Sequence, residues 1–111
     1  MSLNYIVLTG QLAQDSELRY TVSGQPVLQF SLTVKSTANS EEYSYIRVVS
    51  RKEYPADIVK QLKKGTFVLV EGQLLTRTYT VSSGFQKKNI EISLESFNIL
   101  KHTLEESKDI N

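Results

Sequence analysis

The chain has 111 residues, of which 40% are hydrophobic, enough for one compact domain with its own core. It has no cysteine and a single histidine, His102, so a disulfide framework, a thiolate metal site and a histidine-based zinc cluster are all excluded. Its 13 lysines and arginines nearly balance its 12 aspartates and glutamates, and the net charge of +1 does not by itself indicate a polyanionic partner.

The distribution of charge and of apolar residues says more than the totals. Residues 1–100 carry 11 basic and 9 acidic side chains, whereas residues 101–111 carry two basic and three acidic ones, so the body is mildly basic. The first residues lack the basic and apolar regions of a secretory signal, and no apolar run reaches the roughly 18 residues that a membrane span needs. We therefore expect a cytoplasmic protein.

The first third of the chain predicts two strands. Residues 5–12 form a near-continuous apolar run rich in β-branched and aromatic residues, and Gly10 within it suggests a bulge or a bend at a barrel corner. Residues 15–20 form a polar connection, and a glycine and a proline mark a turn at residues 23–26. Residues 27–34 then alternate strictly between apolar and polar, which is typical of a strand with one buried face.

The middle of the chain predicts a third strand and a helix. In residues 43–49, Tyr43, Tyr45 and Arg47 share one face, and we expect at least one of these tyrosines to point to solvent. Residues 55–65 then predict one short helix, with a proline in its first turn and a capping glycine at its end.

The last third predicts a long hairpin. Residues 66–75 form a fourth strand, which residues 76–80 extend to a turn at 82–84, and residues 86–94 return as the fifth. The apolar alternation changes parity near Ser96, which indicates a bulge. Three strands, a helix and two strands are the order of a five-stranded OB-fold barrel, although the pattern alone favours a small open α+β sheet equally.

Three stretches resemble the bacterial single-stranded DNA-binding protein family. They read GQLAQDSELRY at residues 10–20, LKKG at 62–65 and VEGQLLTRTY at 70–79, with YIRVV at 45–49 between the first two. The similarity covers roughly residues 3–100. It implies an all-β, five-stranded OB-fold and non-catalytic, sequence-tolerant binding of single-stranded DNA in replication, repair or recombination. It also implies a nucleoid-associated homotetramer or homodimer in the bacterial cytoplasm, without a cofactor, a metal, a membrane or a small-molecule substrate.

The chain departs from the family pattern in two respects. Tyr45 and Tyr79 stand where the family commonly has tryptophan, while Ala38 and Arg51 stand at two other aromatic positions, so stacking capacity is reduced; an arginine plane can still stack on a base. We expect an OB-fold domain over residues 1–100 and a short flexible tail, residues 101–111, without the family's acidic tip. A primosomal accessory protein, or a protein-interaction scaffold with weak or no DNA binding, is the alternative.

Binding an unpaired strand requires cations for the phosphates and flat side chains for the bases. The alternatives are ordinary: strand lysines are mostly solvated surface, Tyr43 serves equally well in cross-strand pairing or a subunit interface, and two aromatic residues at a hairpin turn can simply pair. RNA is also open, because the same contacts serve both polymers. The predicted DNA-binding residues are Lys35, Tyr43, Tyr45, Arg47, Arg51, Lys52, Arg77, Tyr79, Phe85, Lys87 and Lys88.

The residues outside this set predict assembly and no catalysis. We expect copies to associate through the first strand and the sheet faces around Phe67 and Leu69. The carboxylates are scattered singly, the serines in turns lack a neighbouring base, and the turn glycines do not form a phosphate-binding loop, so enzymatic activity is not expected.

Overall fold

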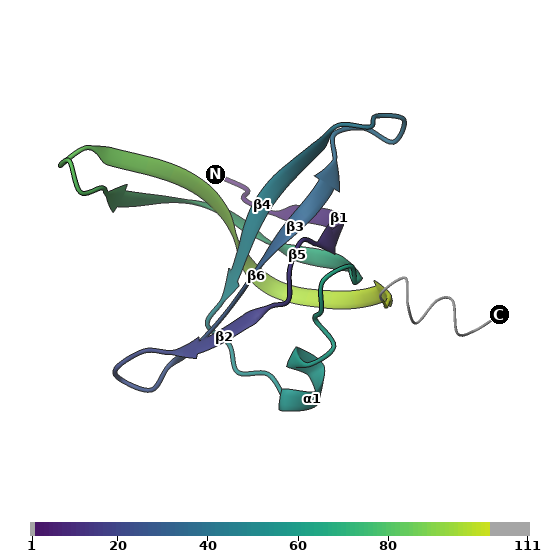
Figure 1. Ribbon diagram of the computed structural model, residues 1–111, viewed down its shortest axis with the longest axis horizontal. Helices are drawn as coiled ribbons and strands as arrows, with labels where there is room; N and C mark the ends of the chain where they lie inside the picture. The colour runs from purple at the N-terminus through teal and green to yellow at the C-terminus, as the bar shows by residue number, and fades with distance from the viewer. Residues whose placement is uncertain (1, 103–111) are drawn as a thin grey trace.

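Six strands and one short helix make up residues 2–102, the part of the chain that the computed structural model describes (Figure 1). The elements are β1 Ile6–Leu12, β2 Glu17–Tyr20, β3 Pro26–Lys35, β4 Tyr43–Ser50, α1 Ala56–Val59, β5 Phe67–Thr80 and β6 Gln86–Lys101. The predicted tail lies outside the described residues, apart from Lys101, which ends β6, and His102.

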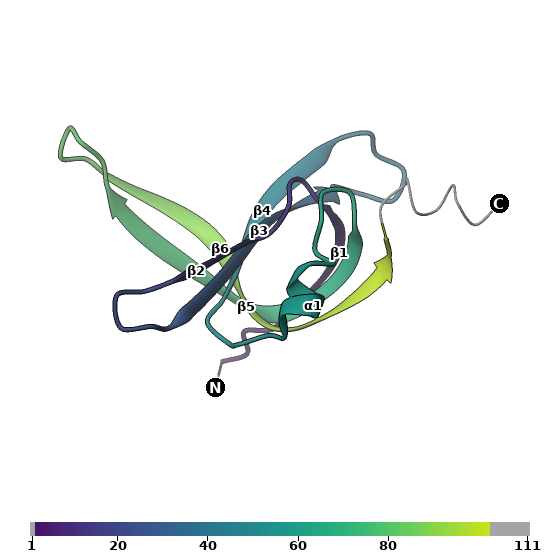
Figure 2. The ribbon, with the colours of Figure 1, turned by 60° about the horizontal axis from the view of Figure 1, so that its bottom comes forward.

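The strands close into a ring, which confirms the predicted all-β barrel. The sheet order is β1-β5-β6-β4-β3-β2, and an additional pairing of β1 with β3 closes the ring of five strands and leaves β2 at the edge. Figure 2 looks through the ring, with α1 at one mouth. None of the helical structure in residues 2–102 is long and apolar enough to cross a membrane.

Alternating apolar residues fill the barrel, as the period-two pattern predicts. On β3 these are Leu28, Phe30 and Leu32, each at most 4% exposed. The helix is followed by Leu62, which is 1% exposed and joins the same core. The remaining core members come from the other strands: Leu12, Val48, Val68, Val70, Ile92 and Leu94.

The predicted bend at Gly10 is confirmed, and its cause is the change of partner along β1. Residues of β1 up to Gln11 pair with β5, while Gln11 itself also lies opposite Thr33 of β3, so the strand turns the barrel corner there. A Cβ on Gly10 would lie 2.8 Å from the Thr33 carbonyl oxygen, which leaves room only for glycine.

Two elements differ from the prediction. β2 is a strand, whereas the sequence pattern indicates a polar connection there. All four of its residues are exposed, so its pairing with β3 leaves no apolar alternation in the sequence. The regular helix is confined to Ala56–Val59, and the chain continues in turns to Gly65. Gly65 has a φ of 90° and ends this segment, as expected of the predicted capping glycine.

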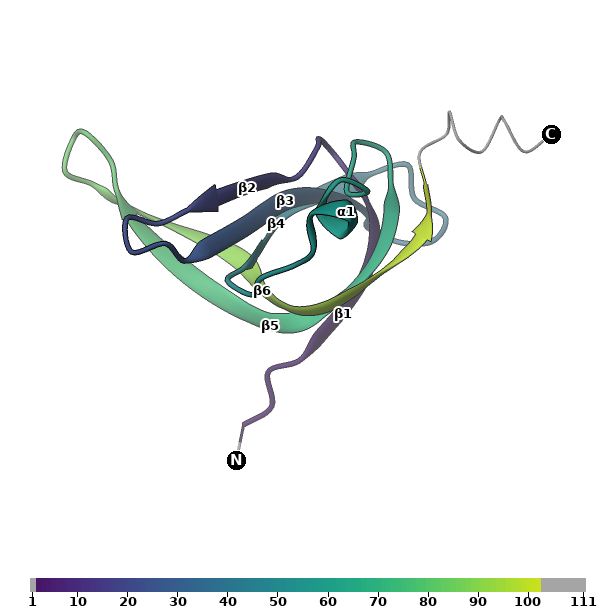
Figure 3. The ribbon, with the colours of Figure 1, turned by 90° about the horizontal axis from the view of Figure 1, so that it is seen from below.

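β5 and β6 form a hairpin that extends well beyond the barrel (Figures 1 and 3). β6 runs on past the predicted end at residue 94, and the predicted bulge near Ser96 is confirmed: Glu71 lies opposite Ser96 and Gly72 opposite Leu94, so Glu95 is the extra residue. Ile90 follows the same alternation as the buried Ile92, but it is 62% exposed because the hairpin has left the core at that point.

Gly72 is the position at which we expect the fold to tolerate a methyl group least. A Cβ there would lie 2.0 Å from the backbone oxygen of Ser93, and no side-chain rotation relieves a clash with backbone. Gly72→Ala should therefore lower the free energy of unfolding in urea by about 3 kcal/mol or more. Gly84→Ala is the control: its φ is 87° with no atom within 4 Å, so it should cost only about 1–2 kcal/mol. Equal losses would contradict the close contact.

Candidate nucleic-acid interface

One surface of the sheet carries most of the predicted binding residues. Alternate side chains of β4 point to it, among them Tyr45 and Arg47, while Ile46 between them packs against the core and Val48 after them lies within it. The register places Ser31 of β3 on one side of Arg47 and Glu91 of β6 on the other. We call this surface the outer face, and it contains two adjoining hollows.

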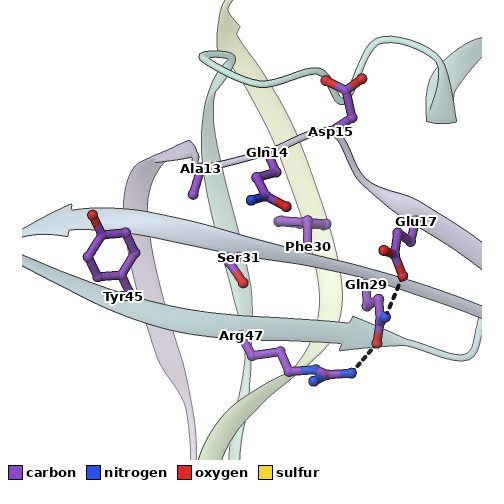
Figure 4. Close-up of a pocket in the computed structure, with 9 residues that line it drawn as sticks. All are labelled: Ala13, Gln14, Asp15, Glu17, Gln29, Phe30, Ser31, Tyr45 and Arg47. Carbon is purple, nitrogen blue, oxygen red and sulfur yellow. Dashed lines mark hydrogen bonds between the residues drawn. The ribbon is translucent and has the colours of Figure 1, made fainter.

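The first hollow, here called the tyrosine hollow, has a volume of about 320 Å³ (Figure 4). Tyr45 stands at one side of it and is 73% exposed. The polar groups around it are largely acidic or uncharged, and they are Gln14, Asp15, Glu17, Gln29, Ser31 and Arg47. A flat neutral group suits this hollow better than an anion.

The second hollow, here called the arginine hollow, has a volume of about 210 Å³ and the opposite electrostatic character. Four arginines line it against a single carboxylate, and Tyr79 adds an aromatic ring. Gln29 and Arg47 line both hollows, so the two hollows adjoin. The charged residues of the arginine hollow are Arg19, Arg47, Arg51, Arg77 and Glu91.

A chain of polar contacts crosses the outer face and touches five strands. Gln29 Nε2 donates to Glu17 Oε2 at 2.9 Å, and Gln29 Oε1 accepts a hydrogen bond from Arg47 (Figure 4). Arg47 Nε lies 3.9 Å from Glu91 Oε2, and Arg77 Nε donates to Glu91 Oε1 at 2.7 Å. We call these five residues the polar row, and it runs along the border between the hollows.

Glu91 is the buried centre of the polar row. Its side chain is only 3% exposed, whereas those of Arg47 and Arg77 are 45% and 40% exposed. A carboxylate withdrawn from water needs compensating charge, and both guanidinium groups turn their Nε edges towards it. Within the described residues the terminal amino groups of Arg77 have no partner, so they remain available to a ligand.

The aromatic residues divide between surface and structure. Tyr43 is 51% exposed, so both β4 tyrosines meet solvent, where the sequence predicts at least one. Tyr79 is half-buried in the arginine hollow, and Phe85 in the hairpin turn is 74% exposed. Among residues 2–102 the ring contact lies elsewhere, between Tyr54 and Phe97 with centroids 5.6 Å apart.

The lysines predicted to bind DNA are spread more widely than the arginines. Lys87 lies directly opposite Tyr79 and shares its side of the hairpin, while Lys88 lies opposite Thr78 and points to the other side. Lys35 lies opposite Tyr43, and both line a separate groove along β1.

Lys52 has a contact that ties it to the fold. Its Nζ donates at 3.0 Å to the carbonyl of Glu95, the extra residue of the bulge. The outer face therefore joins Tyr45, Arg47, Arg51, Arg77, Tyr79 and, by register, Lys87. It does not bring Lys52 or Lys88 into the two hollows.

Sequence reasoning missed Arg19, Gln29 and Glu91. Arg19 lies on the strand that carries no apolar signal, and Gln29 and Glu91 occupy the polar positions of alternating strands, which ordinarily face water. The alternation does place Gln29 and Glu91 on the non-core side. The alternation does not indicate that two arginines from other strands cover Glu91.

Comparison with known proteins defines the class of protein that has this barrel and this face. Residues 3–100 match the model of the single-strand binding protein family, and the chain belongs to that family. Single-stranded DNA-binding protein 1 of Streptococcus agalactiae serotype III is 34% identical over 103 residues, and single-stranded DNA-binding protein A of Bacillus subtilis is 35% identical over the same length. Each alignment covers 89% of this chain, which spans 63% and 60% of those two relatives.

A solved structure shares the fold. The chain in the Plasmodium falciparum SSB complex with ssDNA superposes with a TM-score of 0.79 at 26% sequence identity. The superposition covers 91% of this chain and 97% of that one.

The polar row leads to a prediction about stability. Arg77→Gln removes the closer partner of the buried carboxylate and should lower the free energy of unfolding by about 1–3 kcal/mol. Adding Glu91→Gln removes the group that needs the charge, so the double variant should be more stable than the sum of the single losses by about 0.5–3 kcal/mol. Urea unfolding of all four proteins measures this coupling.

Arg19→Gln is the matched control for that cycle. Arg19 is exposed and makes no ion pair within residues 2–102, so its substitution should change stability by no more than about 0.5 kcal/mol. Strictly additive losses for Arg77 and Glu91 would show that the ion pair contributes nothing.

Proposed function

We propose that the chain binds single-stranded DNA at the outer face, independently of sequence and without catalysis. The observation that carries the proposal is the placement of Tyr45 and Tyr79 in two hollows that share Arg47. Unpaired strands offer π faces on every base and a phosphate at every step, and tyrosine rings with guanidinium groups complement both. The family membership and the names of its bacterial relatives support the same ligand.

The charges of the two hollows suggest how a strand lies on them. The arginine hollow has an excess of three positive charges, so the phosphates belong there. The tyrosine hollow holds the more exposed ring, and its amides and carboxylates suit bases. Such a strand becomes available in the bacterial cytoplasm during replication, repair and recombination, and we infer that the protein acts there.

The exposed rings are what distinguish this function from a scaffold role. A protein-interaction barrel that had lost its DNA role would have no need of Tyr45 at 73% exposure beside a cluster of arginines. Stacking and phosphate contacts do not select DNA over RNA. Competition between oligo-thymidine and oligo-uridine therefore decides which polymer the face prefers.

Titration with a poly-thymidine oligonucleotide at several salt concentrations tests the proposal. Tyr45→Ala and Tyr79→Ala should each weaken binding by about 5- to 150-fold, the equivalent of the 1–3 kcal/mol that one stacked base contributes. The logarithm of the binding constant should fall linearly with that of the salt concentration, by about 0.7 for each phosphate contacted.

Tyr20→Ala is the matched control for the two stacking variants. Tyr20 is also exposed, at 60%, but it follows Arg19 on β2 and so points away from the outer face. Its substitution should leave the affinity unchanged. The proposal would be contradicted if the wild-type protein did not bind at low salt, or if its affinity did not change with salt concentration.

We also propose that copies of the chain associate through β1. Residues 6–10 of β1 use one edge to pair with β5, and within the described residues their other edge has no strand partner. Val7 is 47% exposed there, and Phe67, opposite the end of β1, is 37% exposed. The Tyr5 hydroxyl donates to Glu71, which raises the pKa of the tyrosine and fixes the segment before β1 on β5. An open apolar strand edge is a template for a second copy.

Val7→Lys should therefore shift the molar mass measured by light scattering from an oligomer towards a monomer, because a buried interface does not accept an unpaired charge. Val22→Lys is the control, since Val22 is fully exposed at the tip of the β2–β3 hairpin. A wild-type protein that is monomeric, or a Val7→Lys variant with unchanged mass, would contradict association through β1.

A further inference from the structure

β2 contributes one charged residue to each hollow. Arg19 lines the arginine hollow and Glu17 lines the tyrosine hollow, and their spacing of two residues puts both on the outer face. Figures 2 and 3 show that the β2–β3 hairpin projects to the same side of the barrel as the β5–β6 hairpin. Arg19 and Tyr79, from different hairpins, accordingly line the same hollow.

Arg19 is less compensated than the arginines at the centre of the hollow. Arg47 and Arg77 share the carboxylate of Glu91, which offsets part of their charge. Within the described part of the chain Arg19 and Arg51 have no acidic partner. A phosphate entering the hollow therefore meets its strongest attraction on the β2 side and at the end of β4.

Glu17 has the reverse effect on the other hollow. Of the two carboxylates there, Asp15 is engaged, since Oδ1 accepts from the backbone N–H of Lys64 at 2.8 Å and Oδ2 lies 3.8 Å from Lys63 Nζ. Glu17 is held in place by Gln29, a neutral amide, and among residues 2–102 no cation forms an ion pair with it. A phosphate approaching the tyrosine hollow is repelled there, whereas a neutral base is not.

We propose that β2 sets the path of the bound strand: Arg19 binds a phosphate, and Glu17 keeps phosphates out of the tyrosine hollow. The backbone then passes over the arginine hollow between the two hairpins, and only bases reach the tyrosine hollow. This inference rests on the proposed binding of single-stranded DNA and adds the residues that direct it.

Two neutral substitutions on the same strand should act in opposite directions. Arg19→Gln removes one phosphate contact, so the salt slope for poly-thymidine should fall by about 0.7 and the affinity near 0.1 M salt by about fivefold. Glu17→Gln keeps an acceptor for Gln29 but removes the repulsion, so the affinity should rise by about two- to fivefold.

Variants at Asp57 in α1 and at Lys60, the C-cap of α1, control for net charge, because neither residue lines either hollow. Lys60→Gln and Asp57→Asn change the charge by the same amounts and should move the affinity by much less. Exchanging the charges on β2, with Glu17→Arg and Arg19→Glu together, keeps the net charge and should lower the affinity below that of Arg19→Gln.

The possible failures are distinguishable. No binding by the wild-type protein removes the proposed function itself. A second outcome is that the wild-type protein binds and Tyr79→Ala weakens that binding, while Arg19→Gln and Glu17→Gln change the affinity no more than the Asp57 and Lys60 controls do. That result overturns the role of β2 alone. Urea unfolding of each variant establishes that the fold is intact, and the charge-exchanged variant binding as tightly as wild type also overturns the inference.

Discussion

Two short joints hold the barrel closed, the two residue pairs between β1 and β3 and the pairing of β4 with β6, and the buried carboxylate of Glu91 lies at the second. β4 and β6 pair in parallel over three residue pairs, whereas β5 and β6 pair along the whole length of β5. Glu91 stands opposite Arg47 in the joint and also accepts a hydrogen bond from Arg77. Because a carboxylate so deeply buried requires both neighbouring charges, satisfying Glu91 fixes the two arginines in position. The electrostatics of the outer face thus follow from how the barrel closes.

The same row of contacts separates two chemical environments on one surface. On one side of Arg47 a ring lies among amides and carboxylates, and on the other side a ring lies among guanidinium groups. Phosphates and bases differ in charge, so a strand can satisfy both environments only by turning its backbone to one side and its bases to the other. The resemblance to the family implies tryptophan where this chain has Tyr45 and Tyr79, and a tyrosine ring offers less stacking area. In the proposed binding mode the arrangement of charges therefore contributes correspondingly more to affinity.

Most of the fold follows from local pattern, and the site follows only in part. Strict alternation predicts β3 and its inward face, and Gly10 and the parity change near Ser96 predict the bend and the bulge, because each of these signals is local. The exposure of Ile90 could not be predicted, since it depends on where the hairpin leaves the barrel. The burial of Glu91 depends on two arginines that only the closed sheet brings together.

The exposure of β2 explains both why it could not be predicted from the sequence and why its side chains are accessible to a ligand. All four of its residues are exposed, so packing does not require any of them to be apolar and no periodic signal arises. An edge strand must nevertheless discourage pairing with other chains, and charged side chains such as Glu17 and Arg19 do so. Charges needed at the edge for solubility are also within reach of a strand lying in the hollows beside it. The core does not constrain the side chains of such an edge strand. Its binding properties can therefore change without loss of stability of the fold.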